Sequence, residues 1–205
     1  MKVRTIFRNN QWLAFIPIVG IILYTALFFI AKDRYAGGWE EYLSAQQVMC
    51  DLMQKVSYSG YENDGRILAI IGNTCLFIGM ATFFYLIPLE FKNHSKKILI
   101  AQSLGVMSML NFLFLFTDLH DVLVLTTGVM GTVVVSILIM EYWKRDNSQS
   151  SIYAIICLVC SILVFICYQF KIGMSFFPTF QKTVFLMDSI WVFSSCYRFL
   201  QYNKA

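Results

Sequence analysis

Polar side chains stand at a few isolated places inside or between the long apolar runs of this sequence. They are Asn73, Asn111, the turn residues Thr117, Asp118, His120 and Asp121, and Asp188 with Trp191 one helical turn after it. Polar groups in apolar segments of this length are costly, and they usually face the interior of a helix bundle or a water-filled cavity. These residues are therefore the first candidates for chemistry.

Imidazole and carboxylate groups together can bind a metal ion or exchange protons with a substrate. Asp118, His120 and Asp121 are the candidate metal ligands, and with Asp188 they form the candidate catalytic set. One histidine and a few aspartates do not complete a zinc site. In the alternative interpretation, Asp121 caps the helix that follows, and Asp118 and His120 are solvated turn residues. The sequence identifies no cofactor.

Arg66 is the nearest candidate counter-charge for these acidic residues. Together with them it is expected to line an outward-facing polar pocket. The candidate ligand-binding residues are Asn73, Arg66, Asn111 and Trp191. At 1.5 Å per residue, Asp188 should lie roughly 12 Å below the start of its helix. A proton relay, a ligand contact and a structural hydrogen bond all remain open for this carboxyl group.

The composition requires lipid rather than water as the solvent for much of the surface. Of 205 residues, 58% are hydrophobic and 14% are charged, whereas about a quarter are charged in ordinary soluble domains. The net charge of +4 comes from short segments that flank apolar runs. Such a pattern indicates membrane topology and not a nucleic-acid-binding surface.

Six apolar runs are long enough to cross a bilayer, and they are continuous rather than alternating, which indicates helices. The sequence therefore predicts an all-α membrane protein in which residues 1–205 form a single bundle of six transmembrane helices. The predicted spans are 12–31, 67–89, 98–117, 121–141, 151–170 and 180–200. Cys157 and Cys160 lie inside one run and are interpreted as packing residues.

Ten of the 16 Lys and Arg residues fall in segments on one side of this arrangement. The positive-inside rule then places both termini in the cytoplasm. The long first loop, 32–66, lies on the opposite side. Apolar residues from Trp39 to Val56 recur at helical spacing, which predicts an extracytoplasmic amphipathic helix in this loop.

Several short motifs follow one another in an order that resembles a known group of proteins. They are Tyr35-Ala36-Gly37-Gly38, Cys50-Asp51-Leu52-Met53, Asn63-Asp64-Gly65-Arg66, Gly72-Asn73, Asp118-Leu119-His120-Asp121 and Pro178-x-x-Gln181-Lys182. The chain resembles a bacterial family of six-span membrane proteins of unknown function, distantly similar to the Frag/DRAM/Sfk membrane proteins. Ala36 stands where that family would have proline. The resemblance implies a bacterial inner-membrane location and a lipid-related role, and it carries over no catalytic residue.

Three functions are compatible with these features. The absence of recognisable reaction machinery favours a non-catalytic membrane component that binds membrane lipids, a protein partner or a second copy of itself, and not nucleic acid. The alternative is a membrane-embedded enzyme that acts on a lipid at the outer leaflet through the Asp/His cluster. A small proton-coupled transporter that uses Asp188 is the third, although no span is broken by mid-membrane Gly/Pro pairs.

Overall fold

The computed structural model describes residues 10–35, 49–57, 60–91, 95–144 and 148–201. Apart from one isolated bridge between Val56 and Glu62, the described residues form helices and turns and no strand. The long helices are α2 (Ile16–Asp33), α4 (Arg66–Leu86), α5 (Lys96–Phe112), α6 (His120–Trp143), α7 (Ser148–Phe170) and α8 (Phe177–Gln201). Short 3-10 helices are η1 (Gln11–Phe15), η2 (Met49–Met53) and η3 (Ile87–Glu90).

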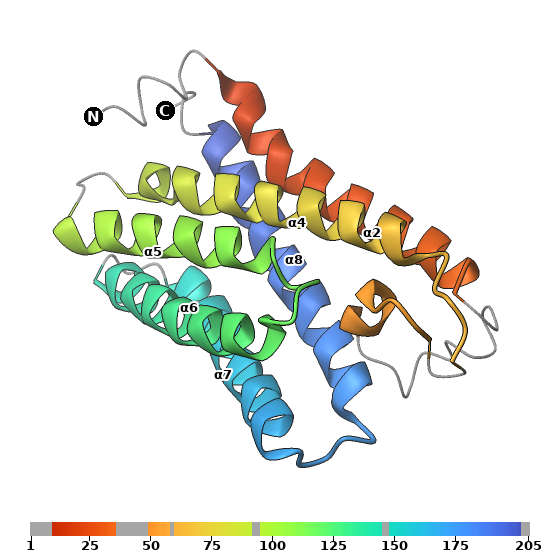
Figure 1. Ribbon diagram of the computed structural model, residues 1–205. Helices are drawn as coiled ribbons and strands as arrows, with labels where there is room; N and C mark the ends of the chain where they lie inside the picture. Colours follow the sequence, from red (N-terminus) through yellow and green to blue (C-terminus); the bar gives the residue numbers. More distant parts are fainter. Residues whose placement is uncertain (1–9, 36–48, 58–59, 92–94, 145–147, 202–205) are drawn as a thin grey trace.

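The six long helices pack in a ring. Each contacts the next along the chain, and α8 closes the ring by packing against α2 and η1 (Figure 1). One end of the bundle holds the start of α4, the turn before α6 and the turn between α7 and α8; it is called the Arg66 end. The opposite end, where η3 meets the last turns of α6 and α8, is called the Glu90 end.

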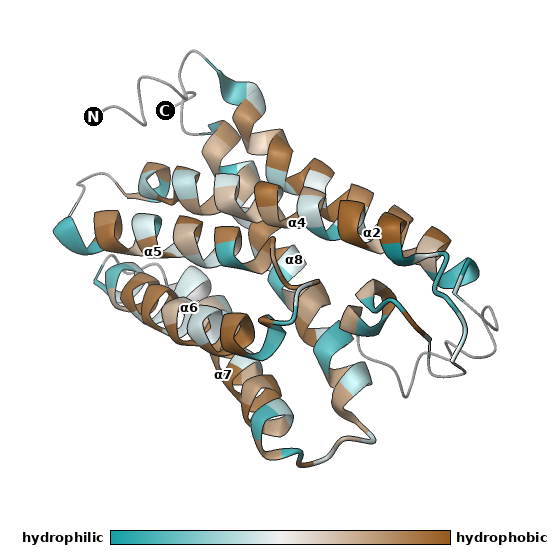
Figure 2. Ribbon diagram, viewed as in Figure 1, coloured by the Kyte–Doolittle hydropathy of each residue, from teal (hydrophilic) through white to brown (hydrophobic). Residues whose placement is uncertain are grey.

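Four of the described helical segments are long and apolar enough to cross a membrane: Gln11–Asp33, Arg66–Glu90, His120–Trp143 and Ser150–Phe170. Apolar residues cover most of these helices, and hydrophilic residues gather toward the bundle ends (Figure 2). This confirms a helical membrane protein. The other two predicted spans are helices but less typical ones. α5 has 17 residues, and α8 carries Lys182, Asp188 and Arg198.

Helix ends follow local sequence signals. Pro17 lies in the first turn of α2, where its missing N–H is no loss. Pro88 instead follows α4, and the chain continues as the 3-10 helix η3 because proline cannot extend an α-helix. Ser95 caps α5: its Oγ accepts a hydrogen bond from the backbone N–H of Ile98 at 3.3 Å.

The tightest contact in the ring joins α2 and α4. A Cβ atom added at Gly20 would lie 2.7 Å from the carbonyl oxygen of Cys75, and one at Gly79 would lie 3.3 Å from the Cα of Gly20. Only glycine allows the two backbones to approach so closely, as in other packed membrane helices. This contact joins the start of α2 to the second half of α4; at the Arg66 end, a Cβ atom added at Gly65 would overlap the carbonyl oxygen of Ala31 near the end of α2.

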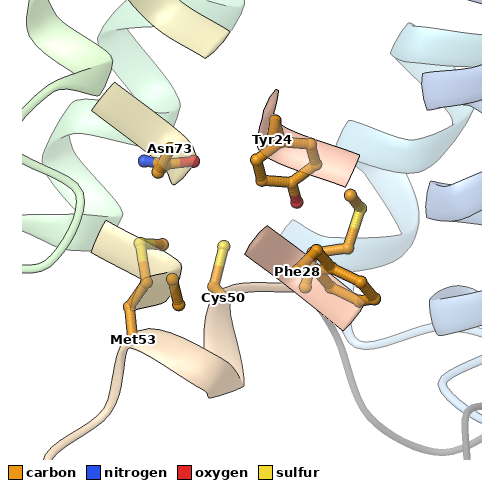
Figure 3. Close-up of a pocket in the computed structure, with 7 residues that line it drawn as sticks. Tyr24, Phe28, Cys50, Met53 and Asn73 are labelled. Atoms are coloured by element: carbon orange, nitrogen blue, oxygen red, sulfur yellow. The ribbon is translucent and has the colours of Figure 1, made fainter. Parts of the chain in front are cut away.

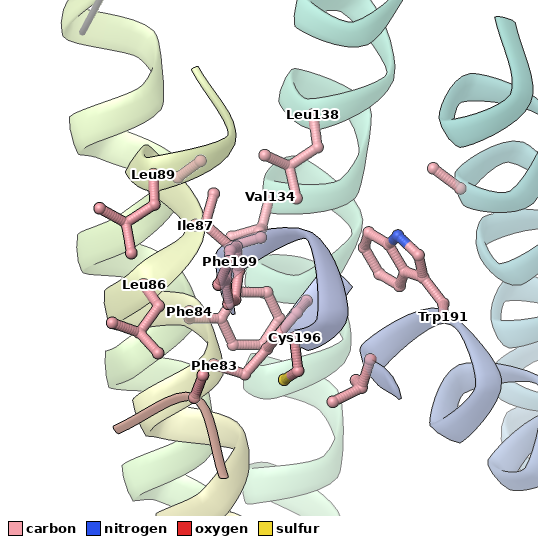
Figure 4. Close-up of a cluster of buried hydrophobic side chains, with 14 of the residues drawn as sticks. Phe83, Phe84, Leu86, Ile87, Leu89, Val134, Leu138, Trp191, Cys196 and Phe199 are labelled. Atoms are coloured by element: carbon pink, nitrogen blue, oxygen red, sulfur yellow. The ribbon is translucent and has the colours of Figure 1, made fainter. Parts of the chain in front are cut away.

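Two hydrophobic clusters support the two ends of the bundle. The larger one lies toward the Glu90 end and includes Phe83, Trp191 and Phe199, with Phe83 and Trp191 packed edge to face at 5.7 Å (Figure 4). The smaller one, at the Arg66 end, packs Leu52 and Met53 of η2 against Tyr35 and Leu115, among others. The second cluster anchors the first loop to the helices.

Most of the predicted amphipathic helix, including Trp39, lies outside the described residues. The described part of the predicted helix forms η2, a short 3-10 helix with Asp51, Leu52 and Met53 buried. After η2 the chain turns back at Gly60, which has a positive φ of 87°. The segment therefore covers the Arg66 end of the bundle before it enters α4.

Candidate functional site

A polar groove opens at the Arg66 end of the bundle, between the first loop and the turn before α6. Its volume is about 440 Å³, within the range of small-ligand sites. The lining residues are Tyr35, Asp51, Met53, Gln54, Lys55, Val56, Ser57, Arg66, Phe116 and Asp118. This hollow, called the Arg66 groove, is the candidate functional site.

Asn63 fixes the shape of the loop that forms one wall of the groove. Its side-chain amide donates to the carbonyl oxygens of Leu52 at 2.8 Å and Gln54 at 3.0 Å. Its side-chain oxygen accepts from the N–H of Gly65 at 3.0 Å. A buried amide with its hydrogen bonds satisfied holds the backbone in one arrangement. Asn63 therefore ties the segment after η2 to the start of α4.

Arg66 is the main cation of the groove. Its Nε donates to the carbonyl oxygen of Met53 at 3.0 Å, which holds the guanidinium against the loop. Among the described residues, its two terminal nitrogens have no hydrogen-bond partner. A guanidinium oriented in this way presents paired N–H donors, the geometry that matches phosphate and carboxylate oxygens.

Asp118 brings a negative charge to the same groove. It lies in the turn between α5 and α6 and is exposed. Its carboxylate forms no hydrogen bond or ion pair with any residue that the structure describes, and none with Arg66. The prediction had placed Arg66 beside the acidic turn, and the structure brings Arg66 and Asp118 to one groove as two separate charges.

His120 and Asp121 belong to a neighbouring cluster. His120 Nδ1 lies 3.1 Å from Asp121 Oδ1, and the Tyr168 hydroxyl donates to that same oxygen at 2.5 Å. Lys171 lies over the Tyr168 ring, 4.3 Å from its centroid. Tyr168 was not among the predicted residues, because its partners are distant in sequence. This His120 cluster links α6 to α7.

The expectation that Asp121 caps α6 is wrong. The helix begins at His120, Leu119 occupies the N-cap position, and no side chain caps it. Asp121 lies in the first turn, where its charge still meets the helix dipole favourably. Its carboxylate accepts from Tyr168 instead of from backbone N–H groups, because the side chain projects toward α7.

Asp188 lies apart from the other acidic candidates. Its carboxyl group interacts with the Cys157 thiol on α7. Trp191, one turn later, is 6% exposed, and its indole N–H has no partner among the described residues. The structure therefore does not join Asp188 to Asp118, His120 and Asp121 in one centre. The Cys157 thiol, interpreted as a packing group, is the polar partner of Asp188.

Asn73 faces a separate small cavity between α2, α4 and η2. The hydroxyl of Tyr24, the thiol of Cys50 and the amide of Asn73 all border this space (Figure 3). Its volume is about 20 Å³, enough for about one water molecule. Burial raises the pKa of the Cys50 thiol to about 12, and the nearby Asp51 carboxylate adds to the effect. Asn111, near the end of α5, borders neither the cavity nor the groove.

No group of three or more His, Cys, Asp or Glu side chains that could hold a metal ion occurs among the described residues. Asp118, His120 and Asp121 are consecutive or nearly so in sequence, but only the last two interact. Asp118 instead faces the groove. The candidate metal ligands thus point to two different places.

A charged network at the Glu90 end was not predicted. Arg198 Nη2 donates to Glu90 Oε1 at 2.9 Å and to Ser195 Oγ at 2.7 Å. The Tyr142 hydroxyl donates to the other oxygen of Glu90, whose side chain is only 4% exposed. Glu90 follows the predicted span 67–89 and was not among the candidate residues. The network joins η3, α6 and α8.

Comparisons with known protein families, curated proteins and solved structures find no match to this chain.

Proposed function

We propose that this protein is a non-catalytic membrane component that binds a phospholipid by its headgroup in the Arg66 groove. The observation that carries the proposal is the guanidinium of Arg66. It is held by Met53 and faces a groove of about 440 Å³ with its terminal nitrogens unpartnered in the described structure. Phosphate is the ligand that such a fork fits best.

The position of the groove supports a lipid over a soluble ligand. Arg66 is the first residue of one apolar segment that could cross a membrane, and Asp118 stands two residues before another. Both charges therefore lie at the level where a bilayer changes from hydrocarbon to headgroups. Phe116, which is 40% exposed, and Val56, which is 51% exposed, line the groove and offer apolar contact to the lipid backbone.

The proposal includes the orientation of the chain. We infer that α5 and α8 cross the bilayer with the four more apolar segments, because they complete the ring and run between the same two ends. The positive-inside rule then places the Arg66 end outside and both termini in the cytoplasm. The resemblance to bacterial six-span proteins supports an inner-membrane location.

A membrane-impermeant maleimide tests this orientation. It should label Ser175→Cys in intact cells and not Lys97→Cys; the reverse pattern would mean that the Arg66 end faces the cytoplasm.

Lipid binding is measured directly by native mass spectrometry of delipidated protein in detergent, titrated with phospholipids. Arg66→Gln should weaken phospholipid binding about tenfold or more, because a charge-assisted hydrogen bond contributes about 1.5–3 kcal/mol. Arg66→Lys, which keeps the charge and loses the fork, should have an intermediate affinity.

The matched control is Arg34→Gln. Arg34 is exposed at the end of α2 near the same end of the bundle and does not line the groove. Its replacement should leave the affinity unchanged. Equal loss in the Arg34 and Arg66 variants would mean that phospholipid responds only to overall charge, and no loss in either would remove the groove as the site.

A lipid-modifying enzyme is the second candidate, and the His120 cluster is the observation that favours it. Asp121 and Tyr168 orient the imidazole through Nδ1, as a general base requires. It ranks second because Nε2, the nitrogen left for proton transfer, is buried. If the protein turns over a lipid, His120→Ala should abolish turnover while the thermal unfolding temperature stays near that of the parent chain. Turnover that survives the substitution excludes this role.

A further inference from the structure

We propose that the Arg66 groove selects zwitterionic phospholipids with a primary amine in the headgroup, the phosphoethanolamine class. This inference rests on the proposed lipid-binding function and names its ligand. The argument comes from two charges in the lining, Arg66 and Asp118, which share one hollow and form no ion pair with each other.

Arg66 and Asp118 come from different elements of the bundle. Arg66 opens α4, beside the first loop, whereas Asp118 lies in the turn before α6. They are not within ion-pair distance of each other, and Asp118 has no partner among the described residues. Each charge is therefore available to a ligand. The loop side of the lining also carries the exposed Lys55 and the buried Asp51.

A headgroup with a single charge would pair with Arg66 or with Asp118 but not with both. The phosphate of a lipid such as phosphatidylglycerol would pair with Arg66, but its uncharged headgroup alcohol would leave Asp118 without a cation. A phosphate followed by an ammonium group places an anion against Arg66 and a hydrogen-bond-donating cation against Asp118. Charge-assisted hydrogen bonds form at both ends of such a ligand. The groove is thus electrostatically complementary to a zwitterion.

The lining also distinguishes a primary amine from a quaternary one. A trimethylated ammonium has no N–H to donate to a carboxylate, and proteins usually recognise it with a cage of aromatic faces. Phe116 is 40% exposed, while Tyr35, the other aromatic residue of the lining, is 2% exposed. One accessible ring does not form such a cage. Recognition of the amine therefore falls to the Asp118 carboxylate, which accepts hydrogen bonds from the N–H groups of the amine.

The test compares three lipids with identical acyl chains in native mass spectrometry of the delipidated full-length protein. The lipids are phosphatidylethanolamine, phosphatidylcholine and phosphatidylglycerol. The parent chain should bind phosphatidylethanolamine about tenfold more tightly than the other two, as one charge-assisted hydrogen bond implies. Asp118→Asn should remove this preference and leave the affinity for phosphatidylglycerol equal or higher.

Asp64→Asn is the matched control, since Asp64 is exposed near the same end of the bundle and does not line the groove. It should keep the preference for the amine lipid. If the three lipids bind equally and Arg66→Gln weakens all of them, the selectivity is wrong and the lipid site stands. If Arg66→Gln changes none of them, both the selectivity and the proposed lipid site fall.

Discussion

At the scale of single residues, the groove depends on side chains that bond to backbone. Asn63 uses its whole amide to hold two carbonyl groups and one N–H, and Arg66 uses one nitrogen to hold the carbonyl of Met53. These bonds leave the charged part of Arg66 for a ligand. Positioning and the proposed ligand binding are thus divided between two residues of one short motif.

Replacing Asn63 with Ala should destabilise the protein and weaken lipid binding together. The substitution leaves buried backbone groups without partners, and each costs about 1–3 kcal/mol. Limited proteolysis should then cut near η2 faster than in the parent chain, and the thermal unfolding temperature should fall. Asp64→Ala, one residue away and exposed, should change neither. Equal proteolysis of the two variants would contradict the role of Asn63.

Cys50 provides a prediction about pH. Its thiol has a pKa of about 12 in the folded protein because of burial and the Asp51 carboxylate, whereas an unfolded cysteine ionises near pH 8.5. The unfolded state loses its proton first, so this thiol's contribution to stability is complete below about pH 8.5 and declines as pH rises toward about 12.

At pH 8.5, alkylation of Cys50 by iodoacetamide should be roughly 100-fold or more slower in the folded protein than in the denatured one, since only the thiolate reacts. Peptide mass spectrometry of both samples measures the ratio. Similar rates in the two samples would show that the thiol is neither buried nor shifted.

At the scale of helices, the contact between α2 and α4 depends on glycine, which has no side chain to hold the two backbones apart. Gly20→Ala places a methyl group 2.7 Å from the carbonyl oxygen of Cys75, and such overpacking costs about 1–3 kcal/mol. We expect a lower unfolding temperature in detergent. Gly131→Ala is the control, because an added Cβ there meets nothing within 4 Å and alanine is the better helix former. If both variants unfold at the same temperature, the two backbones are not in contact at Gly20.

The Glu90 end is held by charge. Arg198→Ala leaves Glu90, with a side chain 4% exposed, without its cation. Loss of one partner of a buried pair costs about 3–5 kcal/mol, and we expect about 2–3 because Arg198 is 37% exposed and partly screened by water. Arg34→Ala, at an exposed site, should have little effect in the same denaturation assay. A loss no larger than that of Arg34→Ala would show the pair to be solvated.

Hydrophobic runs predicted where the helices lie, but one boundary differs in an informative way. The third span was expected over 98–117, and α5 ends at Phe112. Residues 113–115 continue with backbone hydrogen bonds three residues apart, so the apolar Phe112–Phe116 stretch belongs partly to a turn. Hydropathy measures apolar character and not backbone geometry. Phe116, expected inside the third span, therefore lies in the turn after α5 and lines the groove.

The site was harder to predict than the helices. Arg66 and Asp118 stood out as charges beside apolar runs, and the ring of helices brings them together. The lateral packing of the helices decided the rest: it turned Asp121 to Tyr168 and set Asp188 beside Cys157. No local pattern in the sequence specifies which faces of distant helices meet, so these pairings were not predictable.

At the scale of the whole molecule, the protein is a ring of helices with two different ends. In the described part of the Glu90 end, the ion pair of Glu90 and Arg198 and a large apolar cluster join the helices. The Arg66 end is covered by the first loop and opens into a charged groove. A charged groove at one end suits the proposed binding of a lipid headgroup from one face of the membrane.

The most direct measurement replaces Phe116, in the groove, with a photoreactive phenylalanine analogue in living cells. After irradiation, mass spectrometry should find a phospholipid bound covalently at this position, and the adduct should disappear when Arg66→Gln is added. The same analogue at Phe114, which is 56% exposed and does not line the groove, should give lipid adducts that do not depend on Arg66. A protein adduct at Phe116, or a lipid adduct there that survives Arg66→Gln, would contradict headgroup binding by the groove.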